Sequence, residues 1–228
     1  MTSDPLIVAL DVPSLTEAEK LVSELGDECA FYKVGMELYA AAGPDAIEWL
    51  HGLGKSVFLD LKFYDISETV KRAVATVAKH GVRFLTVHGS RAVMQAAAEG
   101  RRNSLLRLLG VTVLTSFDEQ DLIDLGYPCS VSDLVALRVK NARATGMDGI
   151  IASPLEAKAI RELAGPEMLI VTPGVRSATA DTGDQKRVAT PLEAIRNGAD
   201  YLVIGRQVTR AENPAAALRA IRNEISAE

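Results

Sequence analysis

The chain alternates short, β-branched apolar segments with longer amphipathic segments eight times, and this repetition constrains its fold more than any other feature. Division of the 228 residues by eight leaves about 28 residues per unit, enough for one strand, one helix and two short connections. Repeated βα units form parallel sheets that helices cover. The predicted strands are Leu6–Val12, Ala30–Gly35, Ser56–Phe63, Phe84–Gly89, Gly110–Ser116, Gly149–Ser153, Leu169–Gly174 and Asp200–Arg206.

Local signals for helix ends support this division of the chain. Ser14, Ser153 and Thr190 each precede a glutamate by three residues, which is the pattern of an N-terminal capping box. Asn213-Pro214 begins a predicted terminal helix. The glycines expected at helix ends are Gly26, Gly81, Gly165 and Gly198.

The first predicted strand is not followed by the glycine-rich fingerprint of a dinucleotide-binding sheet. Asp11-Val12-Pro13-Ser14 stands there instead, so an open, doubly wound sheet is the less favoured alternative. No linker or charge run separates the eight units. We therefore predict an α/β fold, a single (β/α)8 TIM-barrel domain over residues 1–228, with its active site at the carboxyl ends of the strands.

Charge and cysteine content exclude several classes of partner. Asp and Glu (30) outnumber Lys and Arg (25) for a net charge of −5, so no general basic surface for nucleic acid is expected. The N-terminus lacks the basic region of a secretion signal, and no apolar run approaches the roughly 18 residues of a membrane span. Cys29 and Cys129 fit no metal-ligand spacing and no disulfide framework. We expect a cytoplasmic protein that binds neither nucleic acid nor membrane.

Charged residues end three successive apolar strands. Asp11 closes the first, Lys33 lies in the second, and Asp60 and Lys62 lie in the third. Because side chains alternate across a strand, Asp60 and Lys62 are expected on one face. A buried ion pair is often no more stabilising than a hydrophobic replacement, so function explains this pair better than stability does. Nearby carboxylates would keep both lysines charged, which suits electrostatic stabilisation and proton donation rather than Schiff-base chemistry.

Glycine and arginine end the last two predicted strands. Gly174 and Arg176 follow the seventh strand, and Gly205 and Arg206 end the eighth. Loops at these positions of a TIM barrel commonly bind phosphate through backbone N–H groups, and guanidinium groups add charge-assisted hydrogen bonds. The sequence therefore predicts a phosphate site, with a flap over it formed by the polar segment Ser177–Ala189.

The segment Asp60-Leu61-Lys62-Phe63-Tyr64-Asp65-Ile66-Ser67-Glu68-Thr69 resembles the Asp-x-Lys-x-x-Asp-Ile-x-x-Thr signature of the orotidine 5′-phosphate decarboxylase family in its bacterial form. Tyr64 and Ser67 depart from the family pattern, where histidine and a small or proline residue are usual. Neither position is charged, so the departures concern the geometry of the loop. Further matches follow in chain order at Ile7–Asp11, Tyr32–Gly35, Val113–Ser116, Thr172–Arg176, Gly183–Arg187 and Ile204–Arg206.

The resemblance implies decarboxylation of orotidine 5′-phosphate to uridine 5′-phosphate in pyrimidine biosynthesis, with no cofactor and no metal. By match to the family, Lys62 stabilises a carbanion at C6 and delivers the proton. Lys33, Asp60 and Asp65 complete a charge array around it, and Asp60 lies beside the departing carboxylate. The other implied contacts are Asp11 to the ribose, Thr115 to the pyrimidine ring, and Arg176, Gln185, Gly205 and Arg206 to the phosphate.

The resemblance also implies a homodimer, because in this family the positions of Asp65 and Thr69 reach across the interface into the partner's site. Two other functions stay open. A Mg²⁺-dependent sugar-phosphate aldolase of the hexulose-phosphate synthase type shares the barrel and the Asp-x-Lys-x-x-Asp spacing, although Lys33 and Lys62 beside the carboxylates argue against a cation there. The second open function is a barrel that binds phosphate without catalysis, in which Lys62 would have no role in turnover.

Overall fold

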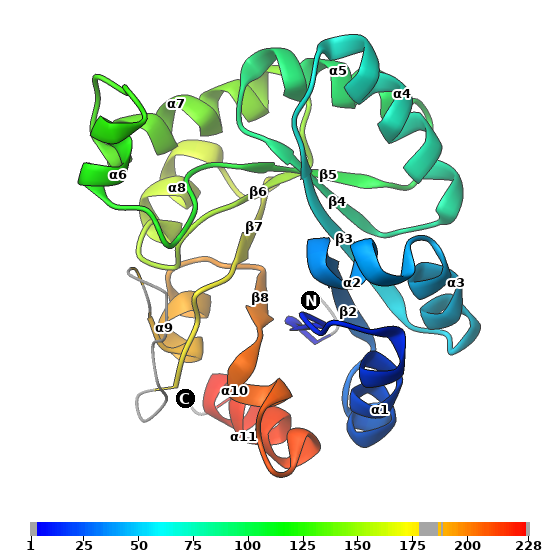
Figure 1. Cartoon of the computed structure of the whole chain (residues 1–228). Coiled ribbons are helices and arrows are strands. Elements are labelled where there is room, and N and C mark those ends of the chain that lie inside the picture. Colours follow the sequence, from blue (N-terminus) through cyan, green and yellow to red (C-terminus); the bar gives the residue numbers. More distant parts are fainter. Residues whose placement is uncertain (1–3, 178–186, 188, 227–228) are drawn as a thin grey trace.

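The computed structural model of the chain describes residues 4–177, 187 and 189–226. Its strands are parallel, and each is hydrogen-bonded to the next in chain order until β8 pairs with β1, so that they form a closed barrel (Figure 1). The predicted (β/α)8 barrel is therefore confirmed. The strands are β1 (Leu6–Ala9), β2 (Phe31–Gly35), β3 (Ser56–Phe63), β4 (Phe84–His88), β5 (Arg107–Val111), β6 (Gly149–Ile151), β7 (Leu169–Thr172) and β8 (Tyr201–Ile204).

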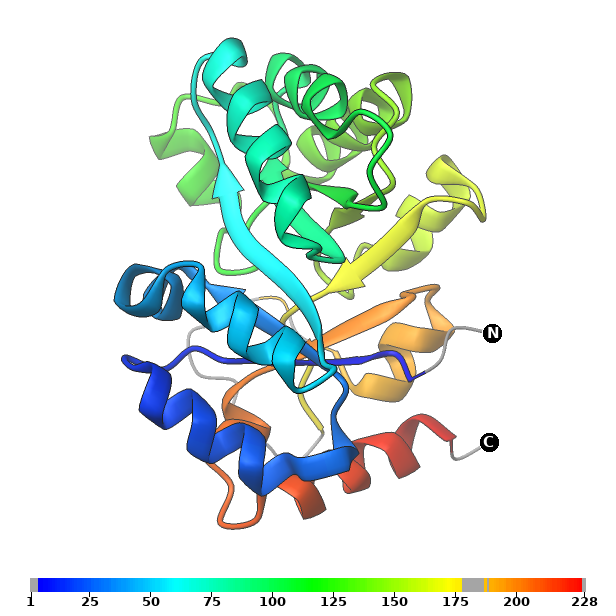
Figure 2. The same ribbon diagram turned by 90° about the vertical axis from the view of Figure 1, so that its right-hand side faces the viewer.

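Helices surround the barrel on its outside, as Figures 1 and 2 show from two directions. Ser14 caps α1 through the Glu17 N–H, and Thr190 forms a reciprocal capping box with Glu193 at α9. No helix among the described residues is long and apolar enough to cross a membrane. The helices are α1 (Leu15–Leu25), η1 (Gly26–Glu28), α2 (Met36–Ala42), α3 (Asp45–Gly52), α4 (Ser67–Val77), η2 (Ala78–His80), α5 (Arg91–Arg101), α6 (Glu119–Asp124), α7 (Val131–Ala144), α8 (Ala157–Ala164), α9 (Pro191–Arg196), α10 (Arg206–Thr209) and α11 (Pro214–Ser226).

Several predicted strands extend one to three residues beyond the observed ones, and two further element boundaries are wrong for a clear physical reason. The fifth strand is Arg107–Val111 rather than Gly110–Ser116, because Arg107 pairs with Phe84 and Val111 with His88, in register with β4. The chain then leaves the barrel and turns, with the Phe117 N–H bonded to the Leu114 carbonyl at 2.9 Å. Helix α8 begins at Ala157 rather than directly after Ser153, because Ser153–Glu156 first forms a separate turn.

The strand residues alternate between two hydrophobic layers. One layer lies between the strands and the helices and includes Leu6, Val8 and Tyr32. Their chain neighbours point the other way, which is the period-two pattern expected of strands. The second layer fills the barrel interior with Ile7, Ala9, Phe31, Phe58, Phe84, Leu109, Val111, Ile151, Val171, Tyr201 and Val203.

Arg83 closes the amino-terminal end of this interior. It directly precedes β4, and its guanidinium carbon lies 5.0 Å from the ring centroid of Phe31, 5.5 Å from that of Phe84 and 5.6 Å from that of Tyr201. Its Nη2 also donates to the Tyr201 hydroxyl at 2.8 Å. Cation–π contacts and this hydrogen bond hold the charge among the rings. The polar cavity described next lies at the opposite, carboxyl-terminal end of the strands.

Candidate active site

Four charged residues, on β2 and β3 and just after β1, form a chain of alternating charge. The Lys33 Nζ lies 2.8 Å from Asp11 Oδ1 and 3.6 Å from Asp60 Oδ2. The Lys62 Nζ lies 2.9 Å from Asp60 Oδ1. The fold thus brings together the residues predicted at the strand ends, in the order Asp11, Lys33, Asp60 and Lys62, which we call the charge array.

The backbone of β3 is irregular where it carries this array. Leu59 pairs with Leu85 and Phe63 with Val87, so a step of four residues on β3 faces a step of two on β4. Lys62 has a φ of 50°, a left-handed conformation that costs a non-glycine residue roughly 1–2 kcal/mol. Asp60 and Lys62 therefore meet across a strained irregularity of the strand, and not through the regular alternation from which their proximity was predicted.

Thr86 of β4 connects the carboxylate of Asp60 to the backbone of Lys62. It is fully buried, its hydroxyl donates to Asp60 Oδ1 at 2.8 Å, and its Oγ1 accepts from the Lys62 N–H at 2.9 Å. This residue was not predicted from the sequence. The available signal was a single hydroxyl within the apolar run of the fourth strand, because buried polar groups are retained with hydrogen-bond partners.

The surroundings of Asp60 decide its charge. Burial by itself would raise the pKa of this carboxyl group, but the Lys33 and Lys62 charges, with hydrogen bonds from Lys62 and Thr86, outweigh burial and hold the pKa below its ordinary value. Asp60 is therefore ionised at neutral pH. The array holds a negative charge between two positive ones at the mouth of the barrel.

The charge array lines a cavity of about 540 Å³ at the carboxyl ends of the strands. Four other predicted site residues line it from β5, β7 and β8 and their loops, namely Thr115, Arg176, Gly205 and Arg206. Thr115 and Arg176 are buried. Gln185 and most of the predicted flap lie outside the described residues. The cavity is thus lined by the carboxylates and ammonium groups of the charge array and also by the two arginines, Arg176 and Arg206.

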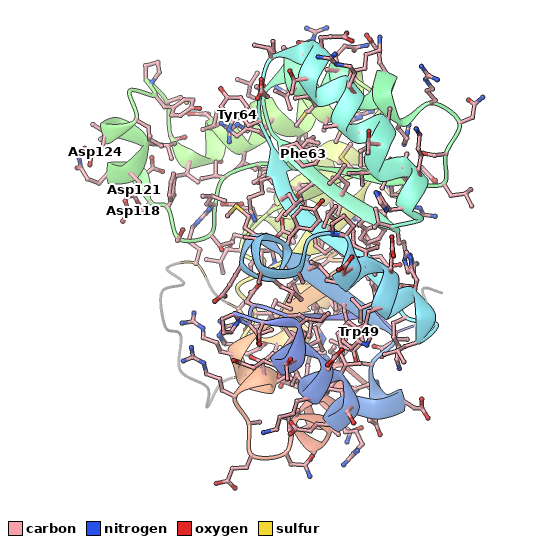
Figure 3. All side chains as sticks on the ribbon, turned by 45° about the vertical axis from the view of Figure 1, so that its right-hand side comes forward. Trp49, Phe63, Tyr64, Asp118, Asp121 and Asp124 are labelled. Carbon is pink, nitrogen blue, oxygen red and sulfur yellow. The ribbon has the colours of Figure 1, made fainter. Side chains whose placement is uncertain are left out.

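Asp65 and Thr69 do not line this cavity. Asp65 is exposed, and its Oδ1 accepts from the Ile66 N–H at 2.6 Å. Tyr64, labelled in Figure 3, lies just past the end of β3 and stacks on His88 with ring centroids 4.2 Å apart. Burial, followed by the charge of Arg138, lowers the pKa of His88, so its ring is neutral at physiological pH. The loop after β3 therefore accommodates Tyr64 through ring stacking.

Arg187 connects three loops at the barrel mouth. Its guanidinium forms an ion pair with Glu156 and donates to the Leu114 carbonyl at 2.8 Å. Its own carbonyl accepts from the Ser153 hydroxyl at 3.2 Å. This contact set, which the sequence did not indicate, holds the loop carrying Thr115 against the turn before α8.

A family model described as the orotidine 5′-phosphate decarboxylase / HUMPS family matches residues 4–221. The chain belongs to this family. A curated orotidine 5′-phosphate decarboxylase from Bradyrhizobium sp. (strain ORS 278) is 53% identical over 223 residues, which cover 98% of this chain and 92% of the relative. One from Nitrobacter winogradskyi is 50% identical over 226 residues, covering 99% and 94%.

Solved structures agree with the decarboxylase family assignment. The crystal structure of orotidine 5′-phosphate decarboxylase from Lactobacillus acidophilus superimposes with a TM-score of 0.85 at 37% identity, over 99% of this chain and 100% of that one. The resemblance predicted from the Asp60–Thr69 motif is confirmed, and with it membership of the carboxy-lyases.

Proposed function

We propose that the chain decarboxylates orotidine 5′-phosphate to uridine 5′-phosphate in pyrimidine biosynthesis, without a cofactor. The charge array in the mouth of a decarboxylase-family barrel is the observation that supports this most. Loss of CO₂ leaves an electron pair in an sp² orbital at C6, which the π system of the pyrimidine cannot delocalise. The rate must then come from charges already oriented toward the developing anion.

We assign to Lys62 the role of stabilising and protonating the carbanion at C6. The bond between C6 and the carboxylate carbon breaks, its electron pair stays on C6, and CO₂ leaves. The Lys62 ammonium stabilises that pair and donates a proton to C6. Asp60 holds the ammonium at 2.9 Å and stands beside the departing carboxylate, which its negative charge destabilises. Lys33, on the other side of Asp60, keeps Asp60 ionised.

The remaining walls of the cavity bind the rest of the nucleotide. Asp11 contacts the ribose, Thr115 the pyrimidine ring, and Arg176, Gly205 and Arg206 the phosphate, together with Gln185. The positions of these described residues around one cavity support the assignment. Binding energy from the phosphate, which does not react, lowers the barrier at C6 when it is realised in the transition state.

The functional unit that we propose is a homodimer in which Asp65 and Thr69 complete the partner's site. Asp65 is exposed and neither residue lines the cavity of its own chain, which supports a role across an interface. Exposed apolar side chains at the same end of the barrel, Met36, Tyr64 and Ile66, support an interface there. The substrate class and the free thiols Cys29 and Cys129 support a cytoplasmic location.

Incubation of the purified protein with orotidine 5′-phosphate is expected to give a loss of ultraviolet absorbance that EDTA does not slow. The two lysines already occupy positions 2.8–3.6 Å from the carboxylates, where a divalent cation would have to bind. Unchanged absorbance with folded protein would refute the decarboxylase. Activity that EDTA abolishes, with turnover of a sugar phosphate instead, would support the Mg²⁺-dependent aldolase.

Replacement of Gly35 by alanine is expected to lower kcat/KM about a hundredfold, the scale of a 1 Å displacement of a catalytic group. A Cβ at this position would lie 2.8 Å from Asp11 Oδ1 and 2.9 Å from Lys33 Nζ, so that pair must move. Gly52→Ala is the matched control, because its added methyl group meets no atom within 4 Å. Steady-state kinetics of both variants provide the check. Equal kinetics would show that the array tolerates the displacement.

A further inference from the structure

Ser177, in the loop after β7, contacts Gln207 of α10, the short helix after β8. The Ser177 N–H donates to Gln207 Oε1 at 3.1 Å, and Gln207 Nε2 donates to Ser177 Oγ at 2.7 Å. The Ser177 hydroxyl donates in turn to Glu224 Oε2 of α11 at 2.7 Å. Ser177 directly follows Arg176, and Gln207 directly follows Arg206. The contact therefore joins the chain one residue beyond each of the two arginines of the cavity.

Three features favour a positioning role for this contact. Gln207 is not a lining residue of the cavity, so its effect on a ligand must pass through its neighbours. Glu224 belongs to a helix anchored in the core through Leu218 and Ile221, which gives the contact a fixed support. A glycine precedes each arginine: Gly174, with a φ of 77°, lies two residues before Arg176, and Gly205 is the N-cap of α10, directly before Arg206. Glycine leaves the backbone many alternative conformations, which an external contact can restrict.

We propose that Gln207 is a positioning residue that sets the separation of Arg176 and Arg206 for a phosphate monoester. This inference rests on the proposed function and deepens its phosphate site. Two guanidinium groups of like charge repel each other, so a site that holds both at one cavity before the ligand arrives reduces the free-energy cost of binding. The Gln207–Ser177 contact provides that restraint through two neutral side chains, and its charged support, Glu224, bonds to the Ser177 hydroxyl.

The test compares Gln207→Met, which keeps the length of the side chain but removes both hydrogen bonds, with the wild-type protein. For orotidine 5′-phosphate we expect kcat/KM to fall roughly tenfold, the scale of one or two lost hydrogen bonds. For orotidine, which lacks the phosphate, kcat/KM should not change. Ser177→Ala keeps the bond from its backbone N–H and should show a smaller loss, and Ser177→Ala/Gln207→Met should be no worse than Gln207→Met. Gln95→Ala is the control, because that glutamine contacts only Glu99 on the surface of α5 among the bonds described.

An equal fall of kcat/KM on both substrates, or no fall on either, would overturn the positioning role. The dissociation constant of uridine 5′-phosphate, measured by calorimetry, gives a readout independent of turnover and should rise by a similar factor in Gln207→Met. If the wild-type protein binds this nucleotide but does not turn over orotidine 5′-phosphate, the proposed function fails while the positioning role is still decided by the binding data. If uridine 5′-phosphate binds equally to wild-type and Gln207→Met proteins, the positioning role fails by itself.

Discussion

Replacement of Lys62 by alanine is expected to lower kcat by about 10⁴-fold or more while the barrel stays folded. A positioned proton donor contributes about 10²–10⁴-fold, and one preorganised group at a developing anion about 10²–10³-fold. Lys62 supplies both in the proposed mechanism. Asp60 would keep Lys33 at 3.6 Å and the hydroxyl of Thr86 at 2.8 Å, so the buried carboxylate is not left without a partner. Absorbance progress curves and circular dichroism measure the two outcomes.

Two further variants make this result specific. Lys71→Ala removes a partly exposed lysine of α4 that is ion-paired with Glu99 of α5 at 2.9 Å, and should leave kcat unchanged. Lys62→Gly should be as inactive as Lys62→Ala but more stable by about 1 kcal/mol in chemical denaturation, because glycine adopts the φ of 50° without steric cost. A Lys62→Ala protein with wild-type turnover would contradict the role of Lys62 and favour a barrel that binds phosphate by other groups.

A mixture of two inactive variants, Lys62→Ala and Asp65→Ala, is expected to regain up to about a quarter of the wild-type activity. In a two-fold dimer, each site would take Lys62 from one chain and Asp65 from the other. A mixed dimer then has one intact site and one site that lacks both groups. Random reassortment makes about half of the dimers mixed, and half of their sites are intact, which gives the quarter.

The design of this mixing experiment separates a shared site from simple additivity. The two variants are mixed at equal concentration, incubated until subunits exchange, and assayed beside each variant alone. Lys62→Ala mixed with a Lys62→Ala/Asp65→Ala double variant is the control, since no combination of those chains restores Lys62. Activity equal to the mean of the separate variants, after subunit exchange has been verified by mass, would rule out the shared site.

The barrel could be predicted because its determinants are local. The strands are short apolar runs, and Ser14 and Thr190 cap their helices through contacts three residues away. The fifth strand is predicted too far along the chain because residues 105–114 are mostly apolar, over a longer stretch than one strand uses, with their β-branched residues at the later end. Which of them join the barrel depends on pairing with Phe84 and His88, and no local pattern encodes that pairing.

The site could be predicted as a set of residues but not as a geometry. Alternation along β3 suggested that Asp60 and Lys62 meet, and they do, at 2.9 Å. The left-handed backbone at Lys62 and the hydrogen bonds of the Thr86 hydroxyl depend on a register shift between β3 and β4. Such a shift is a long-range property. The contacts of Arg187 with Glu156 and of Ser177 with Gln207 join residues about 30 positions apart, and polar residues in loops give no signal of such partners.

Arg83 and the aromatic rings around it fill the amino-terminal end of the barrel interior, so among the described residues the charge array opens to the cavity at the carboxyl ends of the strands. In the proposed mechanism, orotidine 5′-phosphate, CO₂ and uridine 5′-phosphate would all pass through this opening, which is lined by the proposed phosphate ligands Arg176 and Arg206. Carbon dioxide is uncharged and would not be held by the two arginines, whereas the proposed phosphate contacts would retain the nucleotide. We therefore expect an ordered exit in which the gas departs past a nucleotide that is still in place, and release of that nucleotide completes the cycle.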